Sequence, residues 1–269
     1  MSDGRFRVAV LQFPGTNCEY ETAAVIRAAG MDPEVFRWNR PADSLDVFDG
    51  YVIPGGFSYQ DRVRAGAIAA KKSICSALVD AAARGKPILG ICNGAQVLVE
   101  TGLVPGHVPE HVEMALAENR VDGKAGYHCD WVYIRAETQP QHVFSRRFKR
   151  ETVIPIPVAH AEGRFVTRDD AVLERIAAEG QIGFTYCMPD GRIVDTFPVN
   201  PNGAQLNIAG LYNVAGNVLA LMPHPERGAW NRQVPRDLMG VREQSDGPAA
   251  GMQFFLSMRD ALEERRREG

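Results

Sequence analysis

A cysteine flanked by two glycines, at the junction of an apolar run and a helical segment, constrains this chain more than any other feature. The run Ile88-Leu-Gly-Ile91 is typical of a buried strand, and Gly94–Thr101 is predicted as a helix. Gly90 and Gly94 each lie two residues from Cys92. That is the spacing of a nucleophile elbow, a sharp strand-to-helix turn that lifts the nucleophile above a sheet and leaves no room for side chains beside it. The sequence therefore predicts an α/β fold with Cys92 as a nucleophile.

Cys92 is also placed where a thiol becomes reactive. At a helix N-terminus, the helix dipole and N–H groups without partners favour the thiolate. The backbone N–H of Asn93 points at the same spot and is predicted to stabilise an oxyanion there. Most free cysteines are buried residues that only contribute to packing, and the other four are interpreted in that way. They are Cys18, Cys75, Cys129 and Cys187.

A base for this nucleophile is predicted at the end of a later strand. His224 and Glu226 stand two residues apart, directly after the apolar run Asn217–Met222. Residues at this spacing in extended backbone project to the same side, and the flanking prolines 223 and 225 hold the residues before them extended. Glu226 is therefore predicted to orient His224, as the acidic member of a catalytic triad does.

A pair of glycines, Gly55 and Gly56, follows the predicted strand Gly50–Pro54 and precedes Phe57. Successive glycines allow backbone N–H groups to face a ligand, and this string is predicted to supply a second oxyanion donor. The alternative is a plain turn that ends the strand.

The sequence predicts neither a metal site nor a nucleotide-binding site. His107-Val-Pro-Glu-His111 matches the His-x-x-Glu-His string of zinc proteases, which requires one continuous helix. Pro109 lies between the two histidines and is incompatible with a helix interior, so no metal site is predicted. Neither a P-loop string nor a dinucleotide-binding glycine pattern follows a predicted strand, so no cofactor is expected in this chain.

Strands and helices alternate in the first half, and strands dominate the second. The predicted strands of the first half are Arg7–Phe13, Glu34–Trp38, Gly50–Pro54 and Pro87–Ile91, and its helices are 16–29 (opened by a capping box at Thr16), Ala65–Arg84 and Gly94–Thr101. The second half is predicted to contain strands Cys129–Ala136, Thr152–Val158, Ile208–Tyr212 and Asn217–Met222, a hairpin of Gly183–Met188 and Arg192–Phe197, a loop at Gly240–Gly251 and a helix Met252–Arg266. This alternation favours a mostly parallel sheet with helices on both faces, and the absence of repeats or linkers favours a single domain over residues 1–269.

Charge and composition exclude other classes. The chain has 30 Lys and Arg against 33 Asp and Glu, so no broad basic field supports nucleic-acid binding. No apolar run approaches the ~20 residues that a membrane span needs. The five cysteines include no Cys-x-x-Cys pair, which is typical of reduced thiols in the cytoplasm.

The strings around Cys92 and His224 resemble those of the class I, or triad, glutamine amidotransferases. Further strings resemble the glutaminase subunits of phosphoribosylformylglycinamidine synthase, an enzyme of de novo purine synthesis. These strings are Phe13-Pro-Gly-Thr-Asn-Cys18, Gly55-Gly-Phe-Ser-Tyr59, Arg64-Ala-Gly-Ala-Ile-Ala69, Ala159-His-Ala-Glu-Gly-Arg164, Asn200-Pro-Asn-Gly203, Asn207-Ile-Ala-Gly210 and Met222-Pro-His-Pro-Glu-Arg227.

The resemblance implies a fold, an activity and a set of roles. The fold would be the flavodoxin-like sheet of the class I glutamine amidotransferases. The chain would hydrolyse L-glutamine to glutamate and ammonia for a large synthetase subunit, which works with a small accessory subunit and carries ATP and Mg²⁺. The residues fall into three groups: the catalytic Cys92, His224 and Glu226, the oxyanion-hole residues Gly56 and Asn93, and the glutamine-binding residues Gln96, Gly55 and Phe57.

The chain departs from the family pattern at a few places. Gln60 and Ala161 stand where glycine is expected, and the stretches 138–150 and 229–250 are longer than usual. The alternative function is a stand-alone cysteine hydrolase of the same fold, such as a γ-glutamyl hydrolase or a relative of the intracellular proteases. Such an enzyme would act without a synthetase.

Overall fold

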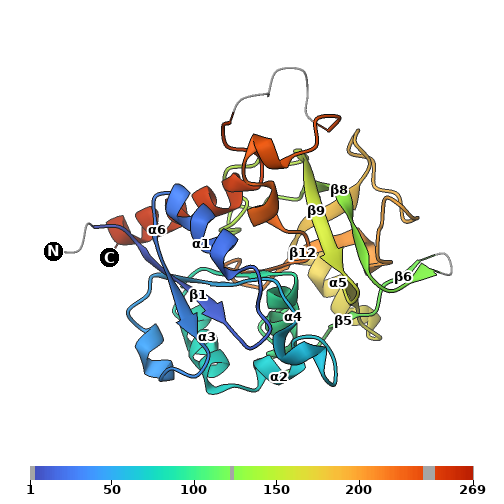
Figure 1. Cartoon of the computed structure of the whole chain (residues 1–269). Helices are drawn as coiled ribbons and strands as arrows, with labels where there is room; N and C mark the ends of the chain where they lie inside the picture. The colour runs from blue at the N-terminus through green and yellow to red at the C-terminus, as the bar shows by residue number, and fades with distance from the viewer. Residues whose placement is uncertain (1–3, 122–123, 239–245, 269) are drawn as a thin grey trace.

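A computed structural model describes residues 4–121, 124–238 and 246–268 (Figure 1). One nine-stranded sheet organises the chain, in the order β2-β1-β3-β4-β13-β12-β11-β8-β9. The first five of these strands are parallel: β2 (Asp32–Arg37), β1 (Arg7–Gln12), β3 (Gly50–Ile53), β4 (Ile88–Ile91) and β13 (Val218–Leu221). The other four are antiparallel: β12 (Ile208–Tyr212), β11 (Ile182–Cys187), β8 (His128–Ala136) and β9 (Val153–His160).

Helices cover the parallel part of the sheet on both faces. In Figure 1, α1 (Glu19–Ala28) and α6 (Met252–Glu268) lie above it, and α3 (Ser73–Ala83) and α4 (Asn93–Glu100) lie below it. Strands β3, β4 and β13 are buried along their whole length, which explains why each is a continuous run of apolar residues and glycine instead of an alternating pattern. The prediction of a mostly parallel sheet covered on both faces, with a strand-rich second half, is confirmed.

Smaller elements complete the described chain. Two short pairs of strands are β5 (Ala115–Ala117) with β10 (Arg164–Val166), and β6 (Arg120–Val121) with β7 (Lys124–Ala125). The remaining helices are α2 (Ala67–Ala70), α5 (Asp170–Ala178) and the 3₁₀ turns η1 (Ala42–Leu45), η2 (Ser58–Asp61), η3 (Gln205–Asn207), η4 (Pro225–Gly228) and η5 (Asn231–Gln233). No helix within the described ranges is both long enough and apolar enough to cross a membrane.

The predicted helix Ala65–Arg84 is wrong as a single element. Helix α2 ends at Ala70 and α3 begins at Ser73, with Lys72 between them in extended backbone. The ammonium group of Lys72 lies 5.3 Å from the ring centre of Trp38 and 5.0 Å from that of Tyr59. These cation–π contacts hold the lysine outside a continuous helix, and an alanine-rich composition gives no sign of them.

The predicted hairpin with Arg192–Phe197 is also wrong, because no strand forms there. The turn expected between the two segments, at Pro189-Asp190-Gly191, is present, since the Met188 N–H donates to the Arg192 carbonyl at 2.8 Å. Strand β11, however, is already paired with β12 on one edge and with β8 on the other. No edge of β11 is free for a third strand, so the segment after the turn does not pair as a strand.

One further expectation is wrong, one helix was missed, and one predicted loop is only partly described. The capping box at Thr16 is wrong, because its hydroxyl accepts a hydrogen bond from the Phe13 N–H at 3.0 Å and helix α1 begins only at Glu19. Helix α5 was not predicted, although Asp169 caps it by accepting from the Ala171 N–H. Part of the predicted loop Gly240–Gly251 lies outside the described residues.

Candidate active site

Three strand ends bring the predicted residues to one edge of the sheet. Cys92 follows β4, the pair Gly55 and Gly56 follows β3, and His224 follows β13. Strands β3, β4 and β13 are adjacent and parallel, so their carboxyl ends lie together. The edge beyond the carboxyl ends of parallel strands is the usual position of ligand sites in α/β sheets.

Cys92 occupies a strained backbone conformation. It has φ 51° and ψ −104°, in the positive-φ region that residues with a side chain seldom adopt, at a cost of order 1–3 kcal/mol. The neighbouring structure enforces this turn, since the Cys92 N–H donates to the Leu221 carbonyl at 2.8 Å. The Cys92 side chain is buried, and its thiol contacts the Ala159 carbonyl at 3.5 Å. The predicted elbow is therefore present.

Both glycines of the elbow are required by close packing. A Cβ atom on Gly94 would lie 1.9 Å from the Ile53 carbonyl oxygen, and one on Gly90 would lie 2.5 Å from the Gly94 carbonyl oxygen. Neither collision can be relieved by moving a flexible side chain. Helix α4 thus starts directly against strands β3 and β4, as the glycine spacing predicts.

His224 and Glu226 form a buried pair. His224 Nδ1 lies 2.6 Å from Glu226 Oε1, and the two side chains are 2% and 0% exposed. The His224 N–H donates to the Pro157 carbonyl at 2.8 Å, which fixes the backbone at that point. The pairing agrees with the prediction, but the predicted extended backbone is wrong. Pro225–Gly228 is a 3₁₀ turn, and this turn brings the carboxylate back to the ring.

The pKa of His224 reflects two opposing influences. Burial is the larger single influence and lowers it, but the charges of Glu226 and of an ionised Cys92 together raise the pKa well above its usual value. Nε2 of the ring is buried without a hydrogen-bond partner. A histidine whose pKa is raised beside a buried carboxylate, with one nitrogen unengaged, is suited to passing a proton to and from a reacting group.

The loop after β3 is built from close backbone contacts. Gly56 has φ 150°, and a Cβ atom there would lie 2.7 Å from the Gly15 carbonyl oxygen. The Phe57 N–H is already engaged with that carbonyl at 2.9 Å. Asn93 is the first residue of α4, where N–H groups have no partner within the helix. Gly56 and Asn93 as the oxyanion donors remain a prediction that this geometry allows.

Side chains join the predicted oxyanion loop to helix α4. Asn93 Oδ1 accepts from the Ser58 N–H at 3.1 Å, and its Nδ2 donates to Gln96 Oε1 at 2.8 Å. Gln96 Nε2 donates in turn to the Glu162 carbonyl at 2.6 Å. The amide of Gln96 is therefore engaged with protein groups, and its contact with glutamine stays a prediction.

The two other predicted glutamine-binding residues border the site in different ways. A Cβ atom on Gly55 would lie 2.7 Å from His224 Cε1, so only glycine fits against the ring. Phe57 is 43% exposed and stacks on Tyr127 with ring centres 6.5 Å apart. Sequence reasoning gave no indication of Tyr127, which follows β7 and reaches Phe57 only through the folded chain.

Asp61, in η2 beside Asn93, is expected to destabilise the protein at neutral pH. Burial and the nearby charge of Glu162 raise its pKa to about 6. The native state thus binds this proton more tightly than the unfolded state, and stability falls as the pH rises from about 4 to 6. Because the carboxyl is partly exposed, water screens its charge and the effect on stability is small. Asp61→Asn should therefore raise Tm by about 2 °C at pH 8 and by less at pH 4.5. Thermal unfolding at the two pH values tests this, and an equal shift at both would contradict it.

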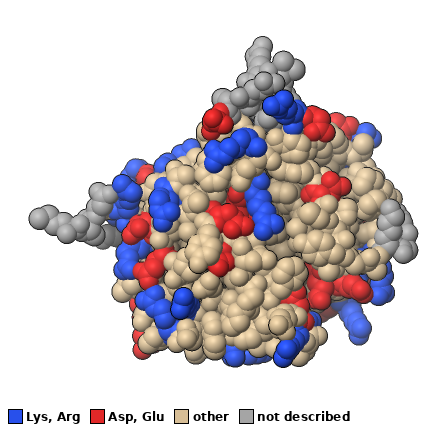
Figure 2. Space-filling view, viewed as in Figure 1, with Lys and Arg blue, Asp and Glu red and all other residues tan. Residues whose placement is uncertain are grey.

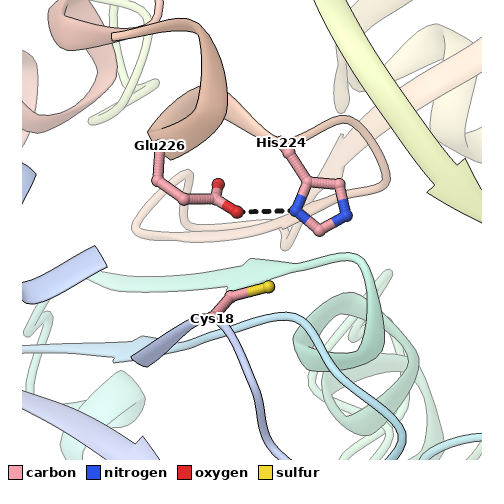
Figure 3. Close-up of side chains that lie close together, drawn as sticks. All are labelled: Cys18, His224 and Glu226. Atoms are coloured by element: carbon pink, nitrogen blue, oxygen red, sulfur yellow. Dashed lines mark hydrogen bonds and ion pairs between the residues drawn. The ribbon is translucent and has the colours of Figure 1, made fainter. Parts of the chain in front are cut away.

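The interpretation of the four other cysteines as buried packing residues is wrong for Cys129, which is exposed, whereas Cys75, Cys187 and Cys18 are buried. Cys18 has polar contacts in addition. It lies in the loop after β1, and its thiol accepts a hydrogen bond from Arg227 Nη2 at 3.0 Å. Figure 3 shows the Cys18 thiol directed toward His224 and Glu226. The signal in the sequence was its position after a strand, since β1 lies beside β3 and ends at the same edge.

The rejected zinc string does not assemble a metal site among the described residues. No helix contains His107 or His111, and both ring nitrogens of His107 are engaged, Nδ1 with Glu113 at 3.1 Å and Nε2 with Gln181 at 2.5 Å.

The surface charge is mixed. On the face shown in Figure 2, acidic and basic side chains are interspersed.

This fold and site define a class of protein: a glutamine amidotransferase, with Cys92 and the His224–Glu226 pair at the carboxyl ends of parallel strands. The family model of the CobB/CobQ-like glutamine amidotransferase domain matches residues 5–260. The chain is 49% identical over 266 residues to the phosphoribosylformylglycinamidine synthase subunit PurQ of Methanothrix thermoacetophila, with 97% of this chain and 99% of the relative covered. It is 43% identical over 223 residues to the PurQ of Methanopyrus kandleri, with 83% and 89% covered.

A solved structure agrees with these relatives. The PurLQS structure from Thermotoga maritima is similar at a TM-score of 0.73 and 32% identity, covering 96% of this chain and 99% of that one. The chain belongs to the PurQ family of phosphoribosylformylglycinamidine synthase subunits, within the glutamine amidotransferases.

Proposed function

We propose that this chain, as a single domain over residues 1–269, is the glutaminase subunit of phosphoribosylformylglycinamidine synthase and acts in the cytoplasm. The observation that carries the proposal is the strained Cys92 at the same sheet edge as the buried His224–Glu226 pair, in a chain nearly half identical to PurQ over its length. The five cysteines are free thiols, which supports a reducing compartment.

The proposed reaction is acyl transfer through a thioester. The Cys92 thiolate attacks the side-chain amide carbon of glutamine, and N–H groups of Gly56 and Asn93 stabilise the oxyanion. His224 Nε2 donates a proton to the leaving ammonia, which leaves a γ-glutamyl thioester on Cys92. His224 then takes a proton from water, hydroxide attacks the thioester, and glutamate departs as the thiolate is restored. Glu226 keeps the Nδ1 proton in place throughout.

Glutamine is proposed to bind in front of Cys92, between the loop after β3 and the start of α4. Gly55 leaves space beside the His224 ring, and Phe57 provides an exposed apolar surface at the entrance. Gln96 lies one turn along α4 from Cys92, and its amide is proposed to contact the substrate after exchanging one of its protein partners.

The ammonia is proposed to pass to the large synthetase subunit, which works with a small accessory subunit. The large synthetase subunit would carry ATP and Mg²⁺ and convert formylglycinamide ribonucleotide to formylglycinamidine ribonucleotide. No cofactor is expected in this chain. The similarity to the PurLQS structure supports these partners.

Dependence on the synthetase tests the proposal. Moving an oxyanion donor by ~1 Å can cost on the order of a hundredfold in rate. The loop that carries Gly56 continues into Tyr59, Gln60 and Asp61, which have φ of 54°, 61° and 51°. Such a strained segment is suited to adopting a second arrangement when a partner docks. Glutamate release by the isolated chain should therefore be about a hundredfold slower than with the synthetase, its nucleotide and its ribonucleotide substrate.

Equal rates with and without the synthetase would instead support the stand-alone cysteine hydrolase. The control is the same assay with Cys92→Ser, which identifies glutamate released by any contaminating glutaminase.

A further inference from the structure

Three different metal-ligating side chains converge at the predicted triad, two of them its own His224 and Glu226. Figure 3 shows Cys18, His224 and Glu226 together, the first from the loop after β1 and the others from the segment after β13. One ligand atom of each, a sulfur, a ring nitrogen and a carboxylate oxygen, lies within 4.8 Å of both others. All three residues are at least 95% buried, with exposures of 1%, 2% and 0%. Within the part of the chain that the structure describes, this is the sole such group.

The chemistry of this group selects a thiophilic divalent cation. Thiolate, imidazole and carboxylate are the ligands of protein zinc sites, at 2.0–2.3 Å in tetrahedral geometry, whereas Mg²⁺ and Ca²⁺ prefer oxygen alone. The Glu226 carboxylate also has an unsatisfied oxygen, because Oε2 is fully buried without a hydrogen-bond partner. A buried carboxylate with an unsatisfied oxygen favours an additional cation nearby.

The thiol lies beside the edge of the ring that carries Nδ1. The position that a Cβ atom on Gly55 would occupy lies 3.1 Å from Cys18 Sγ, 2.7 Å from His224 Cε1 and 3.4 Å from His224 Nδ1, so the sulfur and this edge of the ring border the same small space. Nδ1 is the nitrogen that shares a proton with Glu226 Oε1 at 2.6 Å. A cation between the three groups would therefore occupy the position of that proton and leave Nε2 outside its coordination.

We propose that Cys18 Sγ, His224 Nδ1 and Glu226 form an inhibitory Zn²⁺ site that turns off the glutaminase by replacing the proton shared by His224 and Glu226. Zn²⁺ forms bonds to the sulfur, the nitrogen and a carboxylate oxygen, and the protons of the Cys18 thiol and of Nδ1 are released to solvent. No redox change is involved. The ring keeps its proton on Nε2. The proposed reaction requires the ring to alternate between one proton and two, and the metal on Nδ1 prevents that alternation.

Arg227 sets a limit on this site. Its Nη2 donates to Cys18 Sγ at 3.0 Å and to Glu21 Oε1 at 3.2 Å. Burial raises the pKa of the Cys18 thiol, and the guanidinium charge opposes that shift, but the same charge also opposes a cation beside the sulfur. The side chain of Arg227 is 41% exposed, so it can remain paired with Glu21 while the thiol turns to the metal. Because the nearby guanidinium charge weakens the hold on a cation, zinc binding is expected to be reversible.

Direct binding is measured on the full chain carrying Cys92→Ser, which removes the other thiol near His224. Zn²⁺ is titrated against a chromophoric chelator, and one equivalent should bind. Adding Cys18→Ser or Cys18→Ala should weaken the affinity at least about a hundredfold, because the thiolate is lost. Adding Cys129→Ser, at an exposed cysteine, is the matched control and should leave the affinity unchanged. Thermal unfolding establishes that each variant is folded.

Two results would overturn the site. One is an affinity that does not change with Cys18→Ser and Cys18→Ala, and the other is the loss of all binding in Cys92→Ser, which would place the metal between Cys92 and His224. Co²⁺ provides a spectroscopic check, since a thiolate-to-metal absorption band should be present in Cys92→Ser and absent once Cys18 is also replaced.

The activity measurement rests on the proposed function, whereas the binding measurement does not. In the assembled enzyme, Zn²⁺ should inhibit glutamine-dependent synthesis, a chelator should reverse the inhibition, and ammonia-dependent synthesis should be unaffected. In Cys18→Ser, the zinc concentration for half-inhibition, relative to that variant's own zinc-free rate, should rise at least about tenfold. Zinc binding without any glutaminase activity would contradict the proposed function alone, and inhibition that is identical in wild type and Cys18→Ser would contradict the zinc site alone.

Discussion

The assembled enzyme with Cys92→Ser is expected to lose glutamine-dependent synthesis by about a thousandfold or more and to keep ammonia-dependent synthesis. The serine hydroxyl would occupy the same strained elbow, at φ 51°, and the same buried position. It is a far weaker nucleophile, however, in a site whose imidazolium is stabilised by a thiolate. Ammonia supplied in solution bypasses Cys92 and reaches the synthetase directly. Initial rates with glutamine and with an ammonium salt give the two values.

Selective labelling is the companion measurement. An electrophile that mimics glutamine should modify Cys92 and none of the other cysteines, as mapped by peptide mass. Cys129 is the informative control, because it is exposed and therefore accessible to any reagent. Cys18 is the stricter control, because its buried sulfur lies within 4.8 Å of a ring nitrogen of the same histidine. Labelling of either, or a Cys92→Ser enzyme that still uses glutamine, would contradict the assignment.

The elbow was predictable because its determinants are local. Gly90, Cys92 and Gly94 are close in sequence, and a side chain at Gly90 would collide with Gly94 at the start of the following helix. The collision at Gly94 is with Ile53 of β3 and was not needed to recognise the spacing. The His224–Glu226 pair was predictable for a similar reason, although the expected backbone was wrong. The proline at 225 begins a 3₁₀ turn, and either backbone brings residues two apart near each other.

Contacts that depend on strand order were not predictable from local patterns. Cys18 precedes His224 by more than 200 residues, and only the order β1-β3-β4-β13 places their loops together. The same applies to Tyr127 against Phe57. The missing strand at Arg192–Phe197 is also a non-local effect, because the turn before it favoured a hairpin and only the occupied edges of β11 excluded the second strand.

Glu226→Gln is expected to reduce glutamine-dependent kcat by about 10²–10⁴-fold, the upper value being the loss seen when the acid of a serine-protease triad is replaced by its amide. The carboxylate is fully buried and bonds His224 Nδ1 at 2.6 Å, so its charge acts on the ring with little screening by water. An amide removes that charge, and its NH₂ group can face Nδ1 and stabilise the wrong tautomer.

The pH profile separates an electrostatic role of Glu226 from a structural one. Because the carboxylate charge raises the pKa of His224, its removal must lower the pKa of the imidazolium. The profile of kcat/KM reports the titration of the Cys92–His224 pair, and its pKa for the imidazolium should therefore move down in Glu226→Gln. Glu21→Gln is the matched control, since Glu21 pairs with Arg227 at 3.2 Å but does not contact the ring. Ammonia-dependent synthesis should be unchanged in both variants, which shows that the enzyme still assembles. A Glu226→Gln enzyme within tenfold of wild type, with an unshifted profile, would mean that packing around His224, and not the carboxylate charge, holds the imidazole ready for proton transfer.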